Sequence, residues 1–324
     1  MIFASSLRLL GDFCDFARSG QFHIFLAQSD GKFTRLCAKT CAMVCDPLSS
    51  FSKGSDFLKR MGFFKLLGEG MLLFLAYLGE MALMARGIME SFVKGKVRWG
   101  LVGRQIVSIG FGSQLVVIVT GAFTGAVLTA QTYYQFRSVG LETGVGGVVA
   151  VSMFRELGPV LAGLMVAGRV GAAMCAEIGT MKVSEQLDAL RALGVHPIDY
   201  LVTPRMVAMM VSMPLLVAES IGFGIMLSWV VAVPVFGINQ VFFLHHQQFY
   251  TGMDDLAFAL VKGYFFGLII VLASCYQGFN VSNGAEGVGR NTTKAVVSSS
   301  LFILVLNFFL TIILNQFFPA GFVK

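Results

Sequence analysis

Apolar residues dominate the chain from residue 62 onward, in runs that are too long for the core of a soluble domain. Five of these runs are long enough for tilted transmembrane helices, which need about 20 mainly apolar residues each. They cover residues 106–136, 147–176, 206–235, 256–278 and 295–318. The pattern predicts an all-α integral membrane protein with five transmembrane helices.

The N-terminal part of the chain has a different pattern. Residues 1–60 mix charged residues with Ser, Cys and Phe and contain no long apolar run, so we expect a cytoplasmic extension and a candidate for disorder. Residues 61–324 then form the membrane domain. Its first segment, residues 62–93, is apolar but carries five charged residues. At helical spacing these charges can share one side, which favours an amphipathic helix lying in the membrane interface over a span.

Composition and charge agree with a membrane protein and give it an orientation. Only 13% of the 324 residues are charged, whereas a soluble domain has about 25%. The net charge of +6 need not indicate nucleic-acid binding, because a Lys/Arg excess usually orients a membrane chain. Basic residues gather in 94–104, 177–205 and 279–294, which predicts that these segments are cytoplasmic. The connections 137–146 and 236–255 are then outside, as is the C-terminus.

The inner connection after the second run contains a predicted helix over residues 184–194. Ser184 can cap its start, because its hydroxyl can accept first-turn N–H groups, and Gly194 can end it in a left-handed conformation. Glu185 lies in the first turn, where the helix dipole favours an anion. An apolar ridge follows, formed by Leu187, Leu190 and Leu193. This ridge can lie on the membrane surface or fit a groove of another protein.

The stretch "RELGPVLAGLMVAGRVGAAMCAEIGT" places four charged residues in the second span. A charge at bilayer depth costs at least about 2.5–3.5 kcal/mol, so such groups pair, face a wet cavity or lie near an interface. Arg169 and Glu177 are eight residues apart and can share one helix face, where they pair with each other or bond to other helices. We expect them to fix the inner half of the span. Arg155 and Glu156 lie deeper, just before Pro159.

The continuous run from this stretch through "KVSEQLDALRALGVHPIDYLVTPR" closely resembles the MlaE family. These are permease subunits of lipid-transporting ABC systems that work with MCE-domain proteins, and the resemblance covers residues 62–318. It implies that Arg155 and Glu156 lie at the base of a lipid cavity at a permease dimer interface. The alternative is a buried ion pair that only fixes helix packing. By the same resemblance, the cavity is also lined by Leu128, Gln131, Tyr134 and Gln135. Tyr134 equally suits an interfacial aromatic belt.

The resemblance also implies a set of partners. The chain has no G-x-x-x-x-G-K-[ST] motif, so we expect a permease that is not itself an enzyme and holds no cofactor, with ATP bound by a separate ABC ATPase subunit. The expected ATPase contact comprises Glu185, Gln186, Leu187, Ala189, Leu190 and Gly194. A permease homodimer, an MCE-domain protein outside and membrane phospholipid complete the assembly, with a STAS-domain subunit as a further candidate. The setting implied is the bacterial inner membrane.

Other classes fit the sequence less well. An ion-gradient-driven secondary transporter could also use Arg155 and Glu156, but it predicts inverted repeats that the two halves do not display. Cys37, Cys41 and Cys45 are spaced along one helix face without an obvious fourth ligand, so we expect no metal site.

Overall fold

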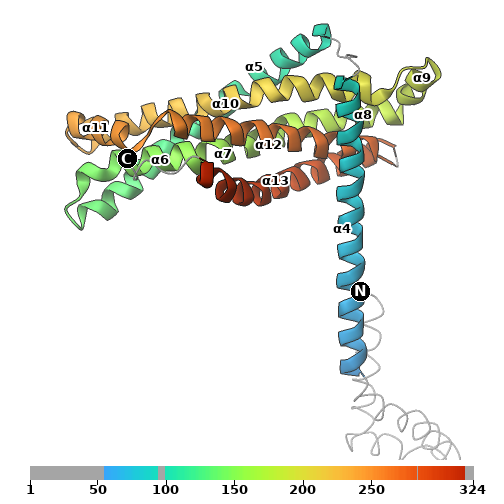
Figure 1. The fold of residues 1–324 in the computed structure, drawn as a ribbon, viewed down its shortest axis with the longest axis horizontal. Coiled ribbons are helices and arrows are strands. Elements are labelled where there is room, and N and C mark those ends of the chain that lie inside the picture. The colour runs from blue at the N-terminus through green and yellow to red at the C-terminus, as the bar shows by residue number, and fades with distance from the viewer. Residues whose placement is uncertain (1–54, 94–98, 283, 318–324) are drawn as a thin grey trace, which may run out of the picture. The chain divides into compact units, whose positions relative to one another are not determined.

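Helices make up almost all of the chain that the computed structural model describes, which is residues 55–93, 99–282 and 284–317 (Figure 1). The α-helices are α4 Ser55–Val93, α5 Trp99–Arg137, α6 Val145–Ser152, α7 Gly158–Val166, α8 Ala172–Val183, α9 Gln186–Ala192, α10 Thr203–Val230, α11 Gln240–Tyr250, α12 Met253–Phe279 and α13 Gly284–Phe317. Residues 1–54, with the three cysteines considered above, lie outside the described residues. The chain divides into two compact units, residues 1–77 and 78–324, and every contact discussed below lies within the second.

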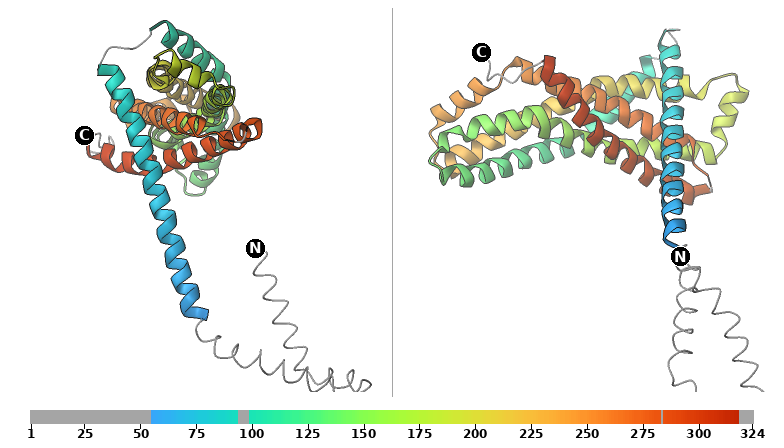
Figure 2. Two further views of the ribbon diagram at one scale, coloured as in Figure 1. Left: turned by 90° about the vertical axis from the view of Figure 1, so that its right-hand side faces the viewer. Right: turned by 60° about the horizontal axis from the view of Figure 1, so that its bottom comes forward.

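Five helical segments are long and apolar enough to cross a membrane, which confirms the five expected spans. They are Trp99–Arg137, Glu142–Val183, Ile198–Val235, Met253–Phe279 and Gly284–Phe317. Each is longer than the apolar run that predicted it, because the helices continue into polar residues at their ends. Figure 2, in its left view, shows most of these helices nearly end-on. The all-α, multi-pass membrane fold follows from these lengths and compositions.

The segment expected as an interfacial helix forms the single helix α4, which begins earlier than the apolar pattern suggested. In its part from residue 78 onward, Met81, Ile88 and Ser91 are buried, while Leu83 and Met89 are exposed. The buried residues are seven and three positions apart, as expected for one packed helix face. The position of this helix in the membrane interface stays a prediction.

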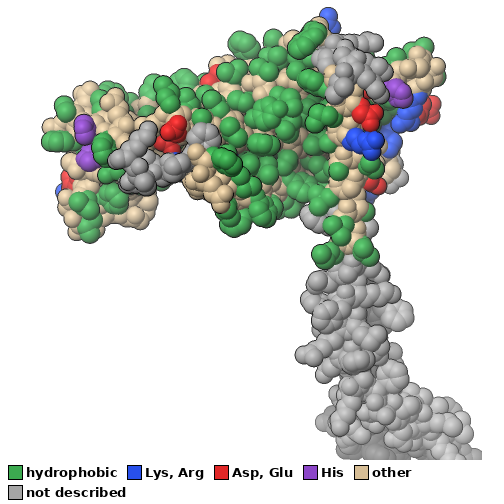
Figure 3. All heavy atoms as spheres, in the orientation of Figure 1, with side chains coloured by type: hydrophobic (Ala, Val, Ile, Leu, Met, Phe, Trp, Pro, Cys, Tyr) green, Lys and Arg blue, Asp and Glu red, His purple; other side chains and the backbone are tan. Residues whose placement is uncertain are grey.

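Two short helices mark the opposite ends of the bundle. α9 follows the second span and α11 precedes the fourth (Figure 1). Hydrophobic side chains cover the middle of the face drawn in Figure 3, and Lys and Arg side chains gather towards the end that carries α9. The apolar middle suits a bundle that lies in hydrocarbon, and the cytoplasmic placement of the α9 end stays a prediction.

The first and third spans pack through small residues. A Cβ atom at Gly125 would lie 2.1 Å from the carbonyl oxygen of Gly224, and one at Gly121 would lie 2.4 Å from the carbonyl oxygen of Ser220. One turn further, Thr129 Oγ1 donates to Ser228 Oγ at 2.7 Å. Glycine therefore lets α5 and α10 approach to backbone contact, the usual basis of helix association in lipid.

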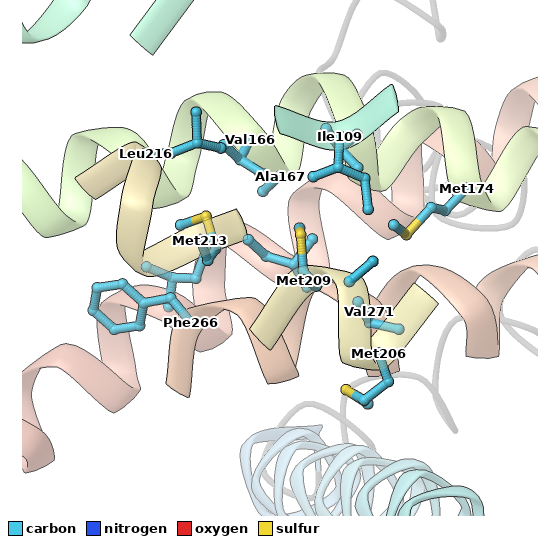
Figure 4. Packing of buried hydrophobic residues seen from close by; sticks show 14 of the residues in the cluster. Ile109, Val166, Ala167, Met174, Met206, Met209, Met213, Leu216, Phe266 and Val271 are labelled. Atoms are coloured by element: carbon cyan, nitrogen blue, oxygen red, sulfur yellow. The ribbon is translucent and has the colours of Figure 1, made fainter. Parts of the chain in front are cut away.

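The main core lies between α5, α7, α8, α10 and α12. Met209 and Met213 of α10 pack towards Phe266 and Val271 of α12 in the labelled cluster of Figure 4. Many of these side chains are Met, Val and Ala, which pack closely without adding polar atoms. This core holds the second span in the interior of the bundle, where half of its apolar window is buried.

The second span is not one regular α-helix. It contains two π-helical turns, η3 Met153–Leu157 and η4 Ala167–Gly171. The first carries Arg155 and Glu156, and the second carries Arg169. π-turns inside helices are frequent at functional sites, because they re-aim side chains that a regular helix would place elsewhere. Two further π-turns, η5 Ile198–Val202 and η6 Val231–Val235, flank α10.

Candidate functional site: an intramembrane charge network and a short helix between the second and third spans

Arg155 is buried and is held by the first turn of α12 and the last turns of α13. Its Nε donates to Asp255 Oδ1 at 2.7 Å, and its Nη1 donates to Asn315 Oδ1 at 2.7 Å. Asp255 Oδ2 also accepts the backbone N–H of Gly252 at 3.0 Å, so the carboxylate is fixed at the start of α12. The arrangement neutralises the guanidinium inside the protein, as a buried charge requires.

Glu156 has a different cationic partner, Lys262 of α12. Lys262 Nζ lies 3.0 Å from Glu156 Oε1, and its side chain is 0% exposed, while that of Glu156 is 40% exposed. Asn307 Nδ2 donates to Glu156 Oε2 at 2.9 Å, and Thr311 Oγ1 lies 3.0 Å from Oε1. Glu156 therefore collects donors from α12 and α13 and keeps one side open at membrane depth.

Lys262 also supports the backbone of the second span. Its Nζ donates to the carbonyl oxygen of Arg155 at 2.7 Å and lies 2.8 Å from Thr311 Oγ1. In a regular α-helix that carbonyl would accept the N–H of Pro159, which proline lacks. Lys262 Nζ thus donates a hydrogen bond to the Arg155 carbonyl, to which Pro159 has no N–H to donate. The ring of Phe258 lies 4.8 Å from Lys262 Nζ and 5.1 Å from Arg155 Cζ, between the two cations.

The structure thus places the two expected site residues in one network with residues that sequence reasoning missed. These are Asp255, Lys262, Asn307, Thr311 and Asn315. Lys262 left a readable signal, because it is the one charged residue in the apolar run 256–278. The Asn and Thr side chains left none, since polar uncharged residues are common on the lipid-free faces of spans.

The four α5 residues expected to line the cavity lie towards the α11 end of the bundle. Leu128 is half-buried and packs on the cluster around Tyr133, while Gln131, Tyr134 and Gln135 are exposed. Just beyond them, Phe136 lines a cavity of about 450 Å³ whose other walls are Leu141, Thr143, Gly144, Gly147, Val148, Val151, Ser152, His246 and Tyr250. Ser152 of this cavity precedes Glu156 by four positions in the sequence.

Arg169 and Glu177 bond to other helices, which was one of the two alternatives. Arg169 Nη1 lies 3.4 Å from Ser113 Oγ of α5. Glu177 Oε2 accepts from Arg205 Nη2 of α10 at 2.6 Å. Both contacts join the second span to a neighbouring helix at the α9 side, and Arg169 itself lies in the π-turn η4. Their expected role in fixing this half of the span stays a prediction.

The short helix of the inner connection exists as α9, but its start differs from the expectation. Ser184 caps the end of α8, where its Oγ donates to the carbonyl of Thr180 at 2.8 Å, so its assignment as the N-cap was wrong. Glu185 precedes α9 with a left-handed φ of 58°. Gly194, with φ of 74°, ends the helix as predicted. The connection between α8 and α9 is only Ser184 and Glu185, where the left-handed Glu185 turns the chain, and Gly194 turns it again after α9.

The apolar ridge of α9 does not form one continuous surface. Leu187 is buried in the main core and Leu190 packs against it, whereas Leu193 is 77% exposed. Glu185, Gln186, Ala189 and Gly194 are exposed. Of the residues expected to contact an ATPase, Leu187 therefore anchors α9 to the bundle, while the polar and small residues around it are accessible.

Comparison with known proteins identifies the family. Residues 102–313 match the family model described as Permease MlaE. A probable ABC transporter permease protein of Rickettsia typhi is 44% identical over 246 residues, which are 76% of this chain and 95% of that protein. The chloroplastic protein TRIGALACTOSYLDIACYLGLYCEROL 1 of Arabidopsis thaliana is 37% identical over 239 residues, covering 74% of this chain and 67% of that protein.

The name of a further relative includes the family name MlaE. The intermembrane phospholipid transport system permease protein MlaE of Haemophilus influenzae is 33% identical over 262 residues, covering 81% of this chain and 99% of that protein. The resemblance drawn from the second span and the inner connection is thus confirmed. With five spans, a helix between the second and third, and this match over most of its length, the chain belongs to the MlaE permease family.

Proposed function

We propose that this chain is the membrane subunit of an ABC transporter that moves phospholipid between the bacterial inner membrane and the outer envelope. Family membership supports a permease, and the name of the Haemophilus influenzae relative supports phospholipid as cargo. In this proposal two copies form a homodimer, a separate ATPase subunit hydrolyses ATP, and an MCE-domain protein binds outside. A STAS-domain subunit is a further candidate partner, and no cofactor is bound by this chain.

The observation that carries the proposal is the open side of Glu156. A carboxylate that is 40% exposed within a span is unstable against hydrocarbon, so it must face water, a polar ligand or another protein. Asn307, Thr311 and Asn315 lie beside it along α13 and form with it a polar edge. A lipid headgroup between two permease copies provides the polar surroundings that this edge requires.

Arg155 takes a positioning role in this proposal. Its guanidinium is buried and bound to Asp255 and Asn315, so the part of the network that meets a headgroup is the open side of Glu156 with Asn307 and Thr311. Such a group of one carboxylate and neutral donors suits the ammonium and phosphate of a zwitterionic headgroup.

The cavity at the α11 end gives the acyl chains a place. Its walls are largely apolar, including Phe136, Leu141 and Val148, and its volume of about 450 Å³ lies in the range of ligand pockets. In the orientation that the basic segments favour, this end faces outward and the C-terminus is periplasmic. We place the exposed α5 residues Gln131, Tyr134 and Gln135 at the entrance to the same lipid path.

The accessible residues of α9 are the proposed contact with the ATPase. Glu185, Gln186, Ala189 and Gly194 face away from the bundle, and Leu187 and Leu190 tie the helix to the core. A short helix held in this way can pass a push from a bound subunit into the membrane helices.

The experiment that tests this function is purification of the tagged chain from its own host in mild detergent, followed by mass spectrometry of proteins and lipids. We expect a Walker-motif ATPase, an MCE-domain protein and stoichiometric phospholipid. A well-folded chain that carries neither ATPase nor lipid would overturn the proposal and favour the gradient-driven transporter, for which Glu156 would be the coupling carboxylate.

A further inference from the structure

We infer that the ion pair between Glu177 and Arg205 transmits the movement of α9 to the membrane helices, so that Arg205 is a positioning residue for transport. This inference rests on the proposed function. The pair joins the last turns of α8 to the first turn of α10, at a distance of 2.6 Å between Glu177 Oε2 and Arg205 Nη2. It therefore closes the base of the connection that carries α9.

The ion pair between Glu177 and Arg205 is partly buried, because the Arg205 side chain lies inside the protein. The side chain of Arg205 is 6% exposed, whereas that of Glu177 is 61% exposed. The Arg205 guanidinium also lies against the thiol of Cys275 on α12, so Glu177 is its carboxylate partner within a largely apolar surrounding. Separating α8 from α10 here would leave a buried guanidinium without this carboxylate, which is costly. The inner ends of the two helices are thus bound to move together.

The end of α8 is also fixed to α12 by close packing. A Cβ atom at Gly278 would lie 2.9 Å from Ile178 Cβ, and one at Gly179 would lie 2.8 Å from Val281 Cγ2. Lys182 Nζ donates to the carbonyl oxygen of Phe279 at 2.5 Å. A displacement of α8 at this end consequently carries α12, whose other half holds Lys262 and Asp255 of the charge network.

The backbone beside α9 allows the movement that the pair would transmit. Glu185 and Gly194 both have left-handed φ values, at the two ends of α9. Glu185 is the one non-glycine residue with positive φ in the described part of the chain. Such backbone positions are often kept at switching elements, where strain is part of the mechanism. Because Leu187 and Leu190 hold α9 to the core, a push on α9 moves the adjoining ends of α8 and α10, and the ion pair keeps these two ends together.

The test separates coupling from stability by measuring lipid moved per ATP hydrolysed. Complexes purified through the tagged permease are placed in proteoliposomes with a fluorescent phosphatidylethanolamine as the lipid probe. The variants are Glu177→Arg, the charge swap Glu177→Arg with Arg205→Glu, and the control Glu286→Arg. Glu286 is exposed at the start of α13, so its substitution makes the same charge change outside the pair.

We expect Glu177→Arg to hydrolyse ATP but to move at least about fivefold less lipid per ATP than wild type. Fivefold is the smallest effect that a typical coupling free energy produces. The charge swap should return this ratio to within about twofold of wild type, and the control should match wild type. If Glu177→Arg moves as much lipid per ATP as wild type, or if its transport and ATPase activities fall by the same factor, the pair is a structural contact and does not transmit movement.

If Glu177→Arg does not assemble, Glu177→Gln gives the same readout, because it keeps the size of the side chain and removes the charge. A wild-type complex that contains no ATPase or moves no lipid would overturn the proposed function itself. Wild-type transport together with an unchanged ratio in the variants would overturn the transmission role alone.

Discussion

Replacing Lys262 with methionine tests whether the charge network holds the second span in place. Lys262 is fully buried and donates to the Arg155 carbonyl, to Glu156 and to Thr311. Methionine has nearly the same length, so the substitution removes the charge and three hydrogen bonds without opening a large cavity. What remains is a carboxylate at membrane depth without its cation.

The expected loss follows from the cost of an unpaired buried charge. Removing one partner of a buried ion pair costs about 3–5 kcal/mol. Because Glu156 is 40% exposed and keeps the donor Asn307, we expect the lower end, about 3 kcal/mol. With an unfolding entropy of about 2.1 cal/mol/K per residue, a loss of 1 kcal/mol lowers the Tm of a chain of this size by about 1.5 °C, so Lys262→Met should lower it by about 4–5 °C.

The assay is thermal unfolding in detergent, with two matched variants. Lys294→Met makes the same chemical change at an exposed position of α13 and should leave Tm nearly unchanged. Adding Glu156→Gln to Lys262→Met removes the uncompensated charge, so the double variant should be more stable than Lys262→Met alone. If Lys262→Met lost no more than Lys294→Met, or if the double variant were the less stable, the network would not bear on the fold as argued.

Three further outcomes are expected. Glu185→Lys should abolish transport while lipid binding persists, because the residue is exposed before α9; wild-type transport by this variant would remove Glu185 from the ATPase contact. Gly125→Ala should lower the free energy of unfolding by about 1–3 kcal/mol, since its Cβ would meet the Gly224 carbonyl, whereas Gly103→Ala has open space; equal effects would contradict the close α5–α10 contact. Deleting residues 1–60 should leave the purified complex unchanged in composition, and loss of a subunit would identify that segment as a docking element.

Much of the fold could be read from the sequence, because the membrane imposes it. Backbone groups in hydrocarbon must bond within their own segment, so long apolar runs such as residues 106–136 can only be helices. The pattern "GAFTG", with Gly121 and Gly125, is typical of a helix face that packs closely in lipid, although it does not name α10 as the partner. The helix after the second span was also readable, as Gly194 marks its end.

The partners of the charged residues could not be read in this way. Arg155 and Glu156 are neighbours in sequence, yet the structure binds one to Asp255 and the other to Lys262. Local spacing likewise left open whether Glu177 bonds to Arg169 or to another helix, and it chose the wrong role for Ser184. These outcomes depend on π-turns and on the approach of distant helices, which spacing along one helix does not encode.

By itself the sequence determined the class of protein, the five spans, the helix α9 and the presence of costly charges in the second span. Hydropathy, small-residue spacing and the expense of a charge in lipid are properties of short segments, so they can be read without a fold. Only the tertiary structure decided the partner of each charged residue. It also decided that one side of Glu156 stays open while Arg155 and Lys262 are buried. Ion pairing joins residues about 100 positions apart, and only the packing of α12 and α13 against the second span brings them within hydrogen-bond distance.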